Sequence, residues 1–489
     1  MLLVAGELEF GFRLEMEIGT FGLLAKRETM IKSRGVAKAT VSDASNFGDT
    51  MTRTLITHAD IVTLDATGAI LRDSEVAVDG ERIVAVGRAP AGFLPDETLD
   101  ATNHVLMPGF VNAHTHASMT FERGWAEDLP LDRWFNERVW VVESQLTAED
   151  VYWGALLAVA EMIRGGTVAF ADHYFYMDRV GEAVEQAGLR ALLAWCVFGE
   201  QNNIGTDLAG TVDFVQRWQG AADGRIRTVL GPHSPYMCEP RFLARTAAVA
   251  ARLGVGIHIH LAESQEQVDN SFSQHDRSPV ELLETNGVFD VPTIAAHCIS
   301  ISEVDQEILA RRGVTVVQCP NCHMKLGMGV TPVPALLARG VNVALGTDGT
   351  ASSNDLNMLK EARLASLIQK LDKRDPEVMA GDLPLRMATQ HGAQALGWPD
   401  SGAIIPGARA DLILLDCDQP HWRPRHDLVA NLLHSAQAGD VSHTMVAGRW
   451  LMKDRQLLTL DMERILWEAE QRAQALVGRD LSIVRTYAS

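Results

Sequence analysis

The feature that most restricts how this chain can fold is a series of short apolar runs, each separated from the next by a stretch of helical character. Eight such runs occur between residues 105 and 348, and VYWGALLAVAEMIRGG is typical of the stretches between them. Alternation of strand-like and helical segments predicts parallel strands covered by helices. Eight such units close into a barrel, so we predict an α/β fold with a TIM-type (β/α)8 barrel.

Two β-rich segments flank the predicted barrel. Short strands broken by turn signals such as DATGA and VDGER precede it, and the same texture returns in GAIIPGARADLILLD and TMVAGRWLMKDRQ. We expect the two segments to pair into one small β-sandwich domain with a C-terminal helix, formed by residues 51–106 and 403–489. The barrel then spans residues 107–402.

Residues 1–50 lack sustained periodicity, whereas Met51 opens the alternating pattern MTRTLITHADIVTLD that is typical of a half-buried strand. The first fifty residues are therefore either a misassigned start or a real extension of unknown role.

The charge of the chain restricts its partners. Its formal net charge is −20, so the summed field repels nucleic acid and anionic membranes. The six cysteines are scattered and fit no disulfide framework, and the start lacks the pattern of a secretory signal. We therefore expect a cytoplasmic protein that binds a small molecule, with no nucleic acid or membrane partner. Chains of this kind often pair through their barrel helices, so we also expect a homo-oligomer.

Polar residues end several of the apolar runs, where a barrel carries its catalytic side chains. His114 and His116 are two apart on an extended segment, so both imidazoles point the same way. This HxH pair alone fits two hydrogen-bonded pocket histidines at least as well as two metal ligands. His260, His297 and Asp348 end three further runs, and imidazole with carboxylate suits an ion such as zinc. Such a site leaves a position for water, whose pKa the ion lowers to about 7.

Glu263 lies three residues after His260 in HIHLAES, within reach of the same end of the barrel. We predict that it is a general acid and base that moves a proton between water and a substrate ring nitrogen. The alternative is a solvated glutamate that starts the next helix. A two-metal site bridged by a carboxylated lysine is disfavoured, because no lysine occurs between Lys38 and Lys325. We therefore expect one metal ion.

Several stretches in fixed order resemble the amidohydrolase superfamily. They are PGFVNAHTHASMTFERGWAEDLPLDRWF, LGPHSPYMC, HIHLAESQEQV, AAHC, KLGMG and LGTDGTASSNDLNM. They are most similar to its S-adenosylhomocysteine/methylthioadenosine deaminase branch, near guanine deaminase and the s-triazine hydrolases. The resemblance runs from about Thr54 to the C-terminal region.

The resemblance implies a metal site and a reaction. His114, His116, His260 and Asp348 correspond to the ligands of one divalent ion, Zn²⁺ with Fe²⁺ as the alternative. Asp348 would also take a proton from the nucleophilic water, and Glu263 would be the proton shuttle. Metal-bound hydroxide would attack the ring carbon that bears an amino group, and ammonia would leave.

The resemblance also implies substrate contacts. His297 corresponds to the residue that orients the water or the departing amine, His233 to a contact with the heterocycle, and Glu143 to a carboxylate against ribose hydroxyls. The implied substrate is an adenosine-type nucleoside such as methylthioadenosine. Alternatives are a pterin or guanine-like base, an s-triazine that loses chloride or an amine, and a metal-free binding module.

Two stretches depart from the family pattern. The region after the third run reads AWCVFGEQNNIGTDLAG, without the arginines expected for the carboxylate of S-adenosylhomocysteine. Where the family often has Asn-Pro-x-Ser-Asn, this chain has Cys319-Pro320-Asn321-Cys322-His323. Its CxxC is compatible with a second metal or redox pair, but buried or pocket-lining thiols are the favoured interpretation.

Five further residues are weaker candidates for substrate contact. Asp172 and His173 end the second run and either touch substrate or form a hydrogen-bonded structural pair. Trp125, Trp134 and Trp140 either stack on a flat heterocycle or pack the first barrel loop.

Overall fold

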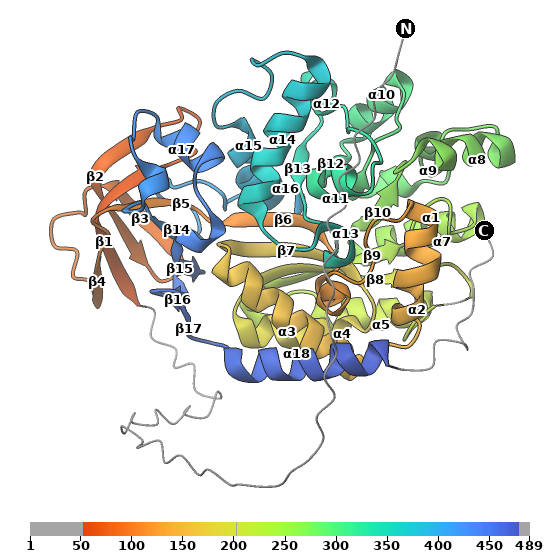
Figure 1. The fold of residues 1–489 in the computed structure, drawn as a ribbon, viewed down its shortest axis with the longest axis horizontal. Helices are drawn as coiled ribbons and strands as arrows, with labels where there is room; N and C mark the ends of the chain where they lie inside the picture. Colours follow the sequence, from red (N-terminus) through yellow and green to blue (C-terminus); the bar gives the residue numbers. More distant parts are fainter. Residues whose placement is uncertain (1–51, 202, 479–489) are drawn as a thin grey trace, which may run out of the picture. The chain divides into compact units, whose positions relative to one another are not determined.

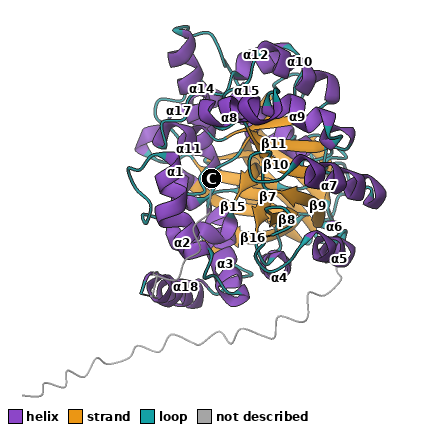
Figure 2. Ribbon diagram, turned by 90° about the vertical axis from the view of Figure 1, so that its right-hand side faces the viewer, coloured by secondary structure: helices purple, strands orange, loops and turns teal. Residues whose placement is uncertain are grey.

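The computed structural model describes residues 52–201 and 203–478, so the extension at residues 1–50 lies outside the described part of the chain. Eight parallel strands form one sheet in the order β13 to β6, and helices surround it (Figure 2). The strands are β6 (Phe110–Thr115), β7 (Thr167–Tyr174), β8 (Arg190–Val197), β9 (Ile226–Pro232), β10 (Ile257–Leu261), β11 (Thr293–His297), β12 (Thr315–Gln318) and β13 (Val343–Leu345). The predicted barrel is confirmed.

The barrel closes where its first and last strands meet. The backbone N–H of Asp348 donates to the carbonyl of His114 at 3.0 Å. The Asn112 amide donates to the Thr347 hydroxyl at 2.8 Å, and its oxygen accepts from the Thr347 N–H at 3.0 Å. A side chain at Gly346 would lie 2.7 Å from the His114 carbonyl oxygen, so only glycine permits this approach. Side chains and single backbone contacts therefore join β6 to β13.

A second, mixed sheet combines strands from both ends of the described chain, on the left of Figure 1. Its order is β17-β16-β15-β14-β5-β1-β2-β3, with β4 paired to β1. The strands are β1 (Arg53–Val62), β2 (Ile70–Asp79), β3 (Arg82–Gly87), β4 (Glu97–Asp100), β5 (His104–Pro108), β14 (Leu412–Asp416), β15 (Val441–Val446), β16 (Arg449–Lys453) and β17 (Gln456–Leu457). A composite domain of N- and C-terminal strands is therefore confirmed.

The run VLMPGFVNAH, expected as one strand, is two strands in different sheets. β5 pairs with β14, and β6 pairs with β7. The change occurs at Gly109, where a Cβ would lie 2.1 Å from a methyl of Val168. Continuous apolar character does not reveal this break, because both strands are buried.

Helices follow most barrel strands. The longer ones are α3 (Ala148–Arg164), α4 (Met177–Ala187), α5 (Leu208–Trp218), α7 (Pro240–Leu253), α8 (Gln265–His275), α9 (Pro279–Thr285), α10 (Glu303–Arg312), α14 (Met358–Lys373), α17 (Leu428–His434) and α18 (Met462–Val477). Short ones at the strand ends are α1 (Leu131–Trp134), α2 (Trp140–Glu143), α6 (Ala221–Gly224), α11 (Pro320–Lys325), α12 (Val333–Ala338), α13 (Thr350–Ser353), α15 (Leu383–Arg386) and α16 (Gly392–Ala395).

The C-terminal helix α18 packs along α3 of the barrel (Figure 1). α3 starts with a capping box, in which the side chains of Thr147 and Asp150 each bond to the other's backbone N–H. Arg472 of α18 reaches the same Asp150 at 3.2 Å. The sequence groups this helix with the small domain, yet it contacts the barrel. Between residues 52 and 478, no helix combines the length and apolar character needed to cross a bilayer.

Candidate active site

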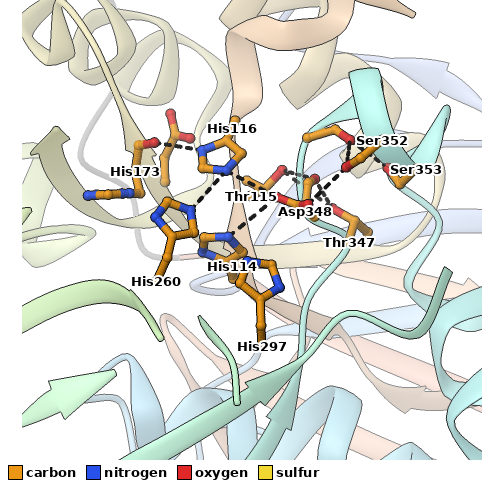
Figure 3. Close-up of polar contacts among 12 residues, drawn as sticks. His114, Thr115, His116, His173, His260, His297, Thr347, Asp348, Ser352 and Ser353 are labelled. Atoms are coloured by element: carbon orange, nitrogen blue, oxygen red, sulfur yellow. Dashed lines mark hydrogen bonds and ion pairs between the residues drawn. The ribbon is translucent and has the colours of Figure 1, made fainter. Parts of the chain in front are cut away.

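Four nitrogen and oxygen donors converge at the carboxyl end of the barrel strands (Figure 3). Ligand atoms of His114, His116 and His260 all lie within 4.8 Å of one another. Asp348 Oδ1 lies 3.0 Å from His116 Nε2 and 3.4 Å from His114 Nε2. The structure therefore brings together the four residues that the sequence suggests as metal ligands. We call them the metal cluster.

Hydrogen bonds on the far side of each ring hold the imidazoles of the metal cluster in place. His116 Nδ1 donates to the carbonyl of His173 at 2.7 Å, and His260 Nδ1 donates to the carbonyl of His233 at 2.9 Å. A carbonyl only accepts, so in the neutral form of each ring Nε2 is the nitrogen that presents a lone pair to the centre. His114 Nδ1 lies 2.9 Å from a ring nitrogen of His258. Partners of this kind orient metal-binding histidines in proteins.

The protonation of the cluster also fits a cation. Burial lowers the pKa of His114 to about 3 and that of His260 well below its usual range, so both rings are neutral, as ligation requires. Burial lowers the pKa of His116, but contact with Asp348 outweighs it and the net pKa is about 9. His114 Nε2 is buried and makes no hydrogen bond. A divalent ion would bind this nitrogen, and it would replace the proton that lies between His116 and Asp348.

Asp348 is held in an unusual backbone conformation, with φ of +60°. Its Oδ2 accepts a hydrogen bond from the Ser352 hydroxyl at 2.8 Å, and its carbonyl accepts one from Thr115 at 2.9 Å. His297 is left-handed as well, at φ +75°. Such conformations cost about 1–3 kcal/mol and persist where surrounding contacts impose them, commonly at functional sites.

Glu263 faces the metal cluster rather than solvent. It follows β10, and only 8% of its surface is exposed. The Tyr236 hydroxyl donates to Glu263 Oε1, and Gln267 accepts from the Glu263 backbone N–H at 3.0 Å. His297 Nε2 lies 3.9 Å from the same carboxylate. The solvated alternative for Glu263 is therefore wrong. The sequence analysis missed Tyr236, although it follows His233 in the GPHSPY stretch.

A cavity of about 460 Å³ opens over the metal cluster. Glu263, His297, His233 and Glu143 all line it, so the candidate catalytic and substrate-binding residues share one space. His233 stacks on Phe198 with ring centroids 5.0 Å apart, and burial lowers its pKa to about 3. It is therefore a neutral imidazole beside the cavity.

Comparisons with known proteins agree with this geometry. A model of the Amidohydrolase family matches residues 105–451. The chain belongs to the amidohydrolase family. It is 45% identical over 433 residues to a 5-methylthioadenosine/S-adenosylhomocysteine deaminase of Pelotomaculum thermopropionicum, covering 88% of this chain and 100% of the relative. The enzyme of the same name from Desulforudis audaxviator is 47% identical over 407 residues, which are 82% of this chain and 95% of the relative.

Among solved structures, an adenosine deaminase of Xanthomonas campestris with bound zinc superposes with a TM-score of 0.83 at 32% identity. The match covers 87% of this chain and 99% of that one. The atrazine chlorohydrolase of Arthrobacter aurescens, at 24% identity and a TM-score of 0.80 over 87% and 100% of the two chains, shares the fold. This amidohydrolase is thus a hydrolase that binds a divalent metal ion and acts on C–N bonds of a small heterocycle.

The departures of this amidohydrolase from its family pattern lie next to His297. His323 Nε2 is 3.1 Å from His297 Nδ1, so it fixes the orientation of that ring. Cys319 and Cys322 are buried and form no disulfide, and burial raises the pKa of both thiols well above their usual range. Cys322 lines the cavity. The favoured interpretation as buried or pocket-lining thiols therefore agrees with the structure.

The weaker candidates divide between the cavity and the core. Asp172 accepts from the Ala117 N–H at 2.8 Å, which agrees with a structural role. His173 and Trp134 line the cavity. Trp140 is buried against Phe198. The ring of Trp125 lies under the guanidinium of Arg138 and is not part of the cavity lining.

A second buried polar group lies opposite the metal cluster, and part of it was not anticipated. Glu143, 3% exposed, lies beside Tyr174 and Glu122. We call Glu122 and Glu143 the acid pair. Burial raises the pKa of Glu143 to about 7, and burial with the neighbouring Glu143 charge raises that of Glu122 well above its usual range. Glu122 lies in ASMTFERG, where nothing in the sequence distinguishes it from a surface residue.

Proposed function

We propose that this chain is a metal-dependent aminohydrolase that releases ammonia from the ring amino group of an adenosine-type nucleoside such as methylthioadenosine. The observation that carries the proposal is that one cavity is lined both by the metal cluster with Glu263 and by Glu143. An amino-bearing ring at the first and a sugar at the second is what a nucleoside deaminase requires. The names of the relatives support the same activity.

In this proposal His114, His116, His260 and Asp348 hold one divalent ion. Three imidazoles and a carboxylate suit Zn²⁺, and the adenosine deaminase neighbour contains zinc. Imidazole also binds Fe²⁺, which is the alternative. When bound, such an ion lowers the pKa of a water molecule to about 7 and so supplies a nucleophile near neutral pH.

The side chains around the cluster then move the protons. Asp348, whose pKa is held well below its usual range by contacts with His114 and His116 against the effect of burial, accepts the proton of the attacking water. Glu263 carries the other proton of that water to the ring nitrogen, and the proton held by Asp348 then passes to the amino group, which leaves as ammonia while the ring carbon becomes a carbonyl. His297, 3.9 Å from Glu263, orients the departing amine.

The remaining lining residues bind the nucleoside. Glu143 Oε1 is buried without a hydrogen-bond partner, so it is an acceptor that ribose hydroxyls would satisfy. His233, neutral and stacked on Phe198, contacts the heterocycle.

Residues 107–402 form the catalytic unit, while residues 51–106 and 403–489 form the accessory domain. The enzyme assembles as a homo-oligomer.

The test is ammonia release by the zinc-loaded protein from adenosine derivatives, guanine, pterins and amino-s-triazines, with chloride followed in parallel. Ammonia from a nucleoside, with no chloride from chlorotriazines, is expected. Turnover of a base, pterin or triazine without turnover of any nucleoside would keep the metal chemistry and reject the nucleoside.

A further inference from the structure

We propose that the cavity selects nucleosides whose 5′ substituent is apolar and uncharged, and rejects those whose substituent carries a carboxylate. This inference rests on the proposed function. It separates two substrates that the name of the relatives joins, because methylthioadenosine ends in an apolar thioether and S-adenosylhomocysteine ends in an amino acid.

A group of packed aromatic rings, which we call the aromatic wall, lines the same cavity as Glu143. Phe198 is its centre, with ring centroids 5.8 Å from Phe175 and 5.5 Å from Trp140. Phe135 stacks on Trp140 at 6.0 Å. Phe135, Phe175, Phe198, Cys196 and Met237 all line the cavity. A thioether gains from contact with aromatic faces and loses little hydration on entering such a wall.

Apart from histidines, the side chains of the cavity lining that can carry a charge near neutral pH are carboxyl groups. Among the residues that line it in the described part of the chain, none is lysine or arginine. Its carboxyl groups belong to Asp132, Glu143, Glu263, Glu266 and Asp348. A substrate carboxylate would give up hydration without gaining a cationic partner, and it would approach groups of like charge. The lining therefore penalises a substituent carboxylate, including the one in the zwitterionic tail of S-adenosylhomocysteine, and does not penalise an uncharged substituent.

Two arginines outside the cavity lining are held in ion pairs. Arg133, beside Asp132 on α1, is bound to Glu137 at 2.8 Å. Arg245 on α7 is bound to Glu200 at 2.7 Å. A substrate carboxylate would have to break one of these pairs to draw on either arginine, which leaves the exposed Arg277 as the cation to test.

The first test is the ratio of kcat/KM for methylthioadenosine to that for S-adenosylhomocysteine, measured by ammonia release from the zinc-loaded enzyme at low ionic strength. We expect methylthioadenosine to be preferred about 100-fold, as for an unpaired charge in a partly buried site. Added salt should shrink the ratio, because it screens repulsion at the mouth. Equal turnover of the two substrates would overturn the proposal.

Binding separates this inference from the proposed function. Adenosine derivatives with a 5′-carboxylate or a 5′-carboxamide differ in charge and hardly in shape, and calorimetry on the metal-loaded protein gives the affinity of each. The carboxamide should bind at least about 10-fold more tightly. If it does while no nucleoside releases ammonia, the selectivity stands and the proposed reaction fails. Equal affinity overturns the selectivity whether or not ammonia is released.

Arg277 supplies the control. It is exposed after the end of α8 and lies outside the lining. Arg277→Ala should leave the substrate ratio unchanged. A selective loss of S-adenosylhomocysteine turnover in this variant would show that a surface cation serves the carboxylate, and would overturn the proposal.

Discussion

The metal cluster and the acid pair are equally buried and differ in how their polar atoms are satisfied. In the metal cluster, each histidine is held through one ring nitrogen and turns the other toward a common centre. In the acid pair, Glu122 Oε2, Glu143 Oε1 and the adjacent Tyr174 hydroxyl have no hydrogen-bond partner. The first group is arranged for a cation. In the second group, burial raises the pKa of the carboxyl groups, so they stay protonated at a higher pH than exposed glutamates do.

This difference separates chemistry from recognition. Neutral rings of His114 and His260 beside an ionised aspartate, with His116 losing its extra proton as the ion binds, give a set of donors for a metal. Carboxyl groups whose pKa values are raised by burial can both donate and accept, which suits the hydroxyl groups of a sugar. Changes in the metal cluster should therefore affect turnover of every substrate, whereas changes in the acid pair should affect only substrates with a sugar.

Asp348→Asn should have the largest effect. It removes the only carboxylate of the metal cluster and the proposed proton acceptor, so we expect loss of bound zinc and a fall in turnover of about 10³-fold or more. Metal content by mass spectrometry and ammonia release measure the two effects. Ser352→Ala, which removes only one hydrogen bond to Asp348, should cost about 10-fold in metal affinity. Full activity of the asparagine variant would contradict the metal assignment.

Glu263→Gln should come next, with retained metal and a fall in kcat of about 10² or more, since proton transfer is lost. The separation of metal content from turnover distinguishes Glu263 from the metal cluster. Tyr236→Phe is the matched control, because it removes the hydroxyl that orients the carboxylate and keeps the carboxylate itself. We expect a smaller loss, of about 10-fold. Near-normal turnover of the glutamine variant would remove Glu263 from the mechanism.

Glu143→Gln should sharpen the comparison on the side of the acid pair. For nucleosides, KM should rise about 10-fold, because an ionisable acceptor for the ribose is lost. The kcat should change less, and zinc content should stay the same. A substrate lacking the sugar serves as control and should show no change. An equal effect on both substrates would argue against a contact with ribose.

Glu361→Gln should have the smallest effect of the four. It tests the effect of burial alone, because Glu361 is neither a metal ligand nor part of the cavity lining. It lies on α14 outside the cavity lining, accepts from the Asn321 N–H at 3.0 Å, and has a pKa raised by burial from 4.5 to about 8. The folded state therefore binds more protons than the unfolded state between these pH values, and stability falls as pH rises through them by up to about 1.4 kcal/mol per unit. Glu361→Gln should flatten this dependence in chemical denaturation at pH 5 to 9. An unchanged slope would contradict it.

The barrel and its polar strand ends were predictable, because both depend on local pattern. His114, His116, His260 and Asp348 end apolar runs, and parallel strands carry their carboxyl ends to one face. The roles of these residues stay predictions until the variants are measured. One boundary was not predictable from the apolar runs. At Gly109 a new strand starts because the backbone passes close to Val168, and the composition of the run does not change there.

What the sequence could not predict depends on contacts between distant segments. Tyr236 meets Glu263, His323 meets His297, and Glu122 meets Glu143 only after the barrel has closed. Each of these partners is an ordinary polar residue in its own stretch. Their importance comes from burial beside another ionisable group, which no local pattern encodes.

The closure of the barrel has a consequence for how the enzyme is assembled. His114 belongs to the first barrel strand, His116 directly follows that strand and Asp348 follows the last, and Thr115 and Asp348 are 233 positions apart in the chain. An ion bound by the two histidines and by Asp348 would link β6 to β13 where the barrel closes. During synthesis the chain could not complete this metal site until its eighth barrel strand and Asp348 had been made. Chelation should then loosen the barrel first between these two strands, where amide hydrogen exchange would detect the opening.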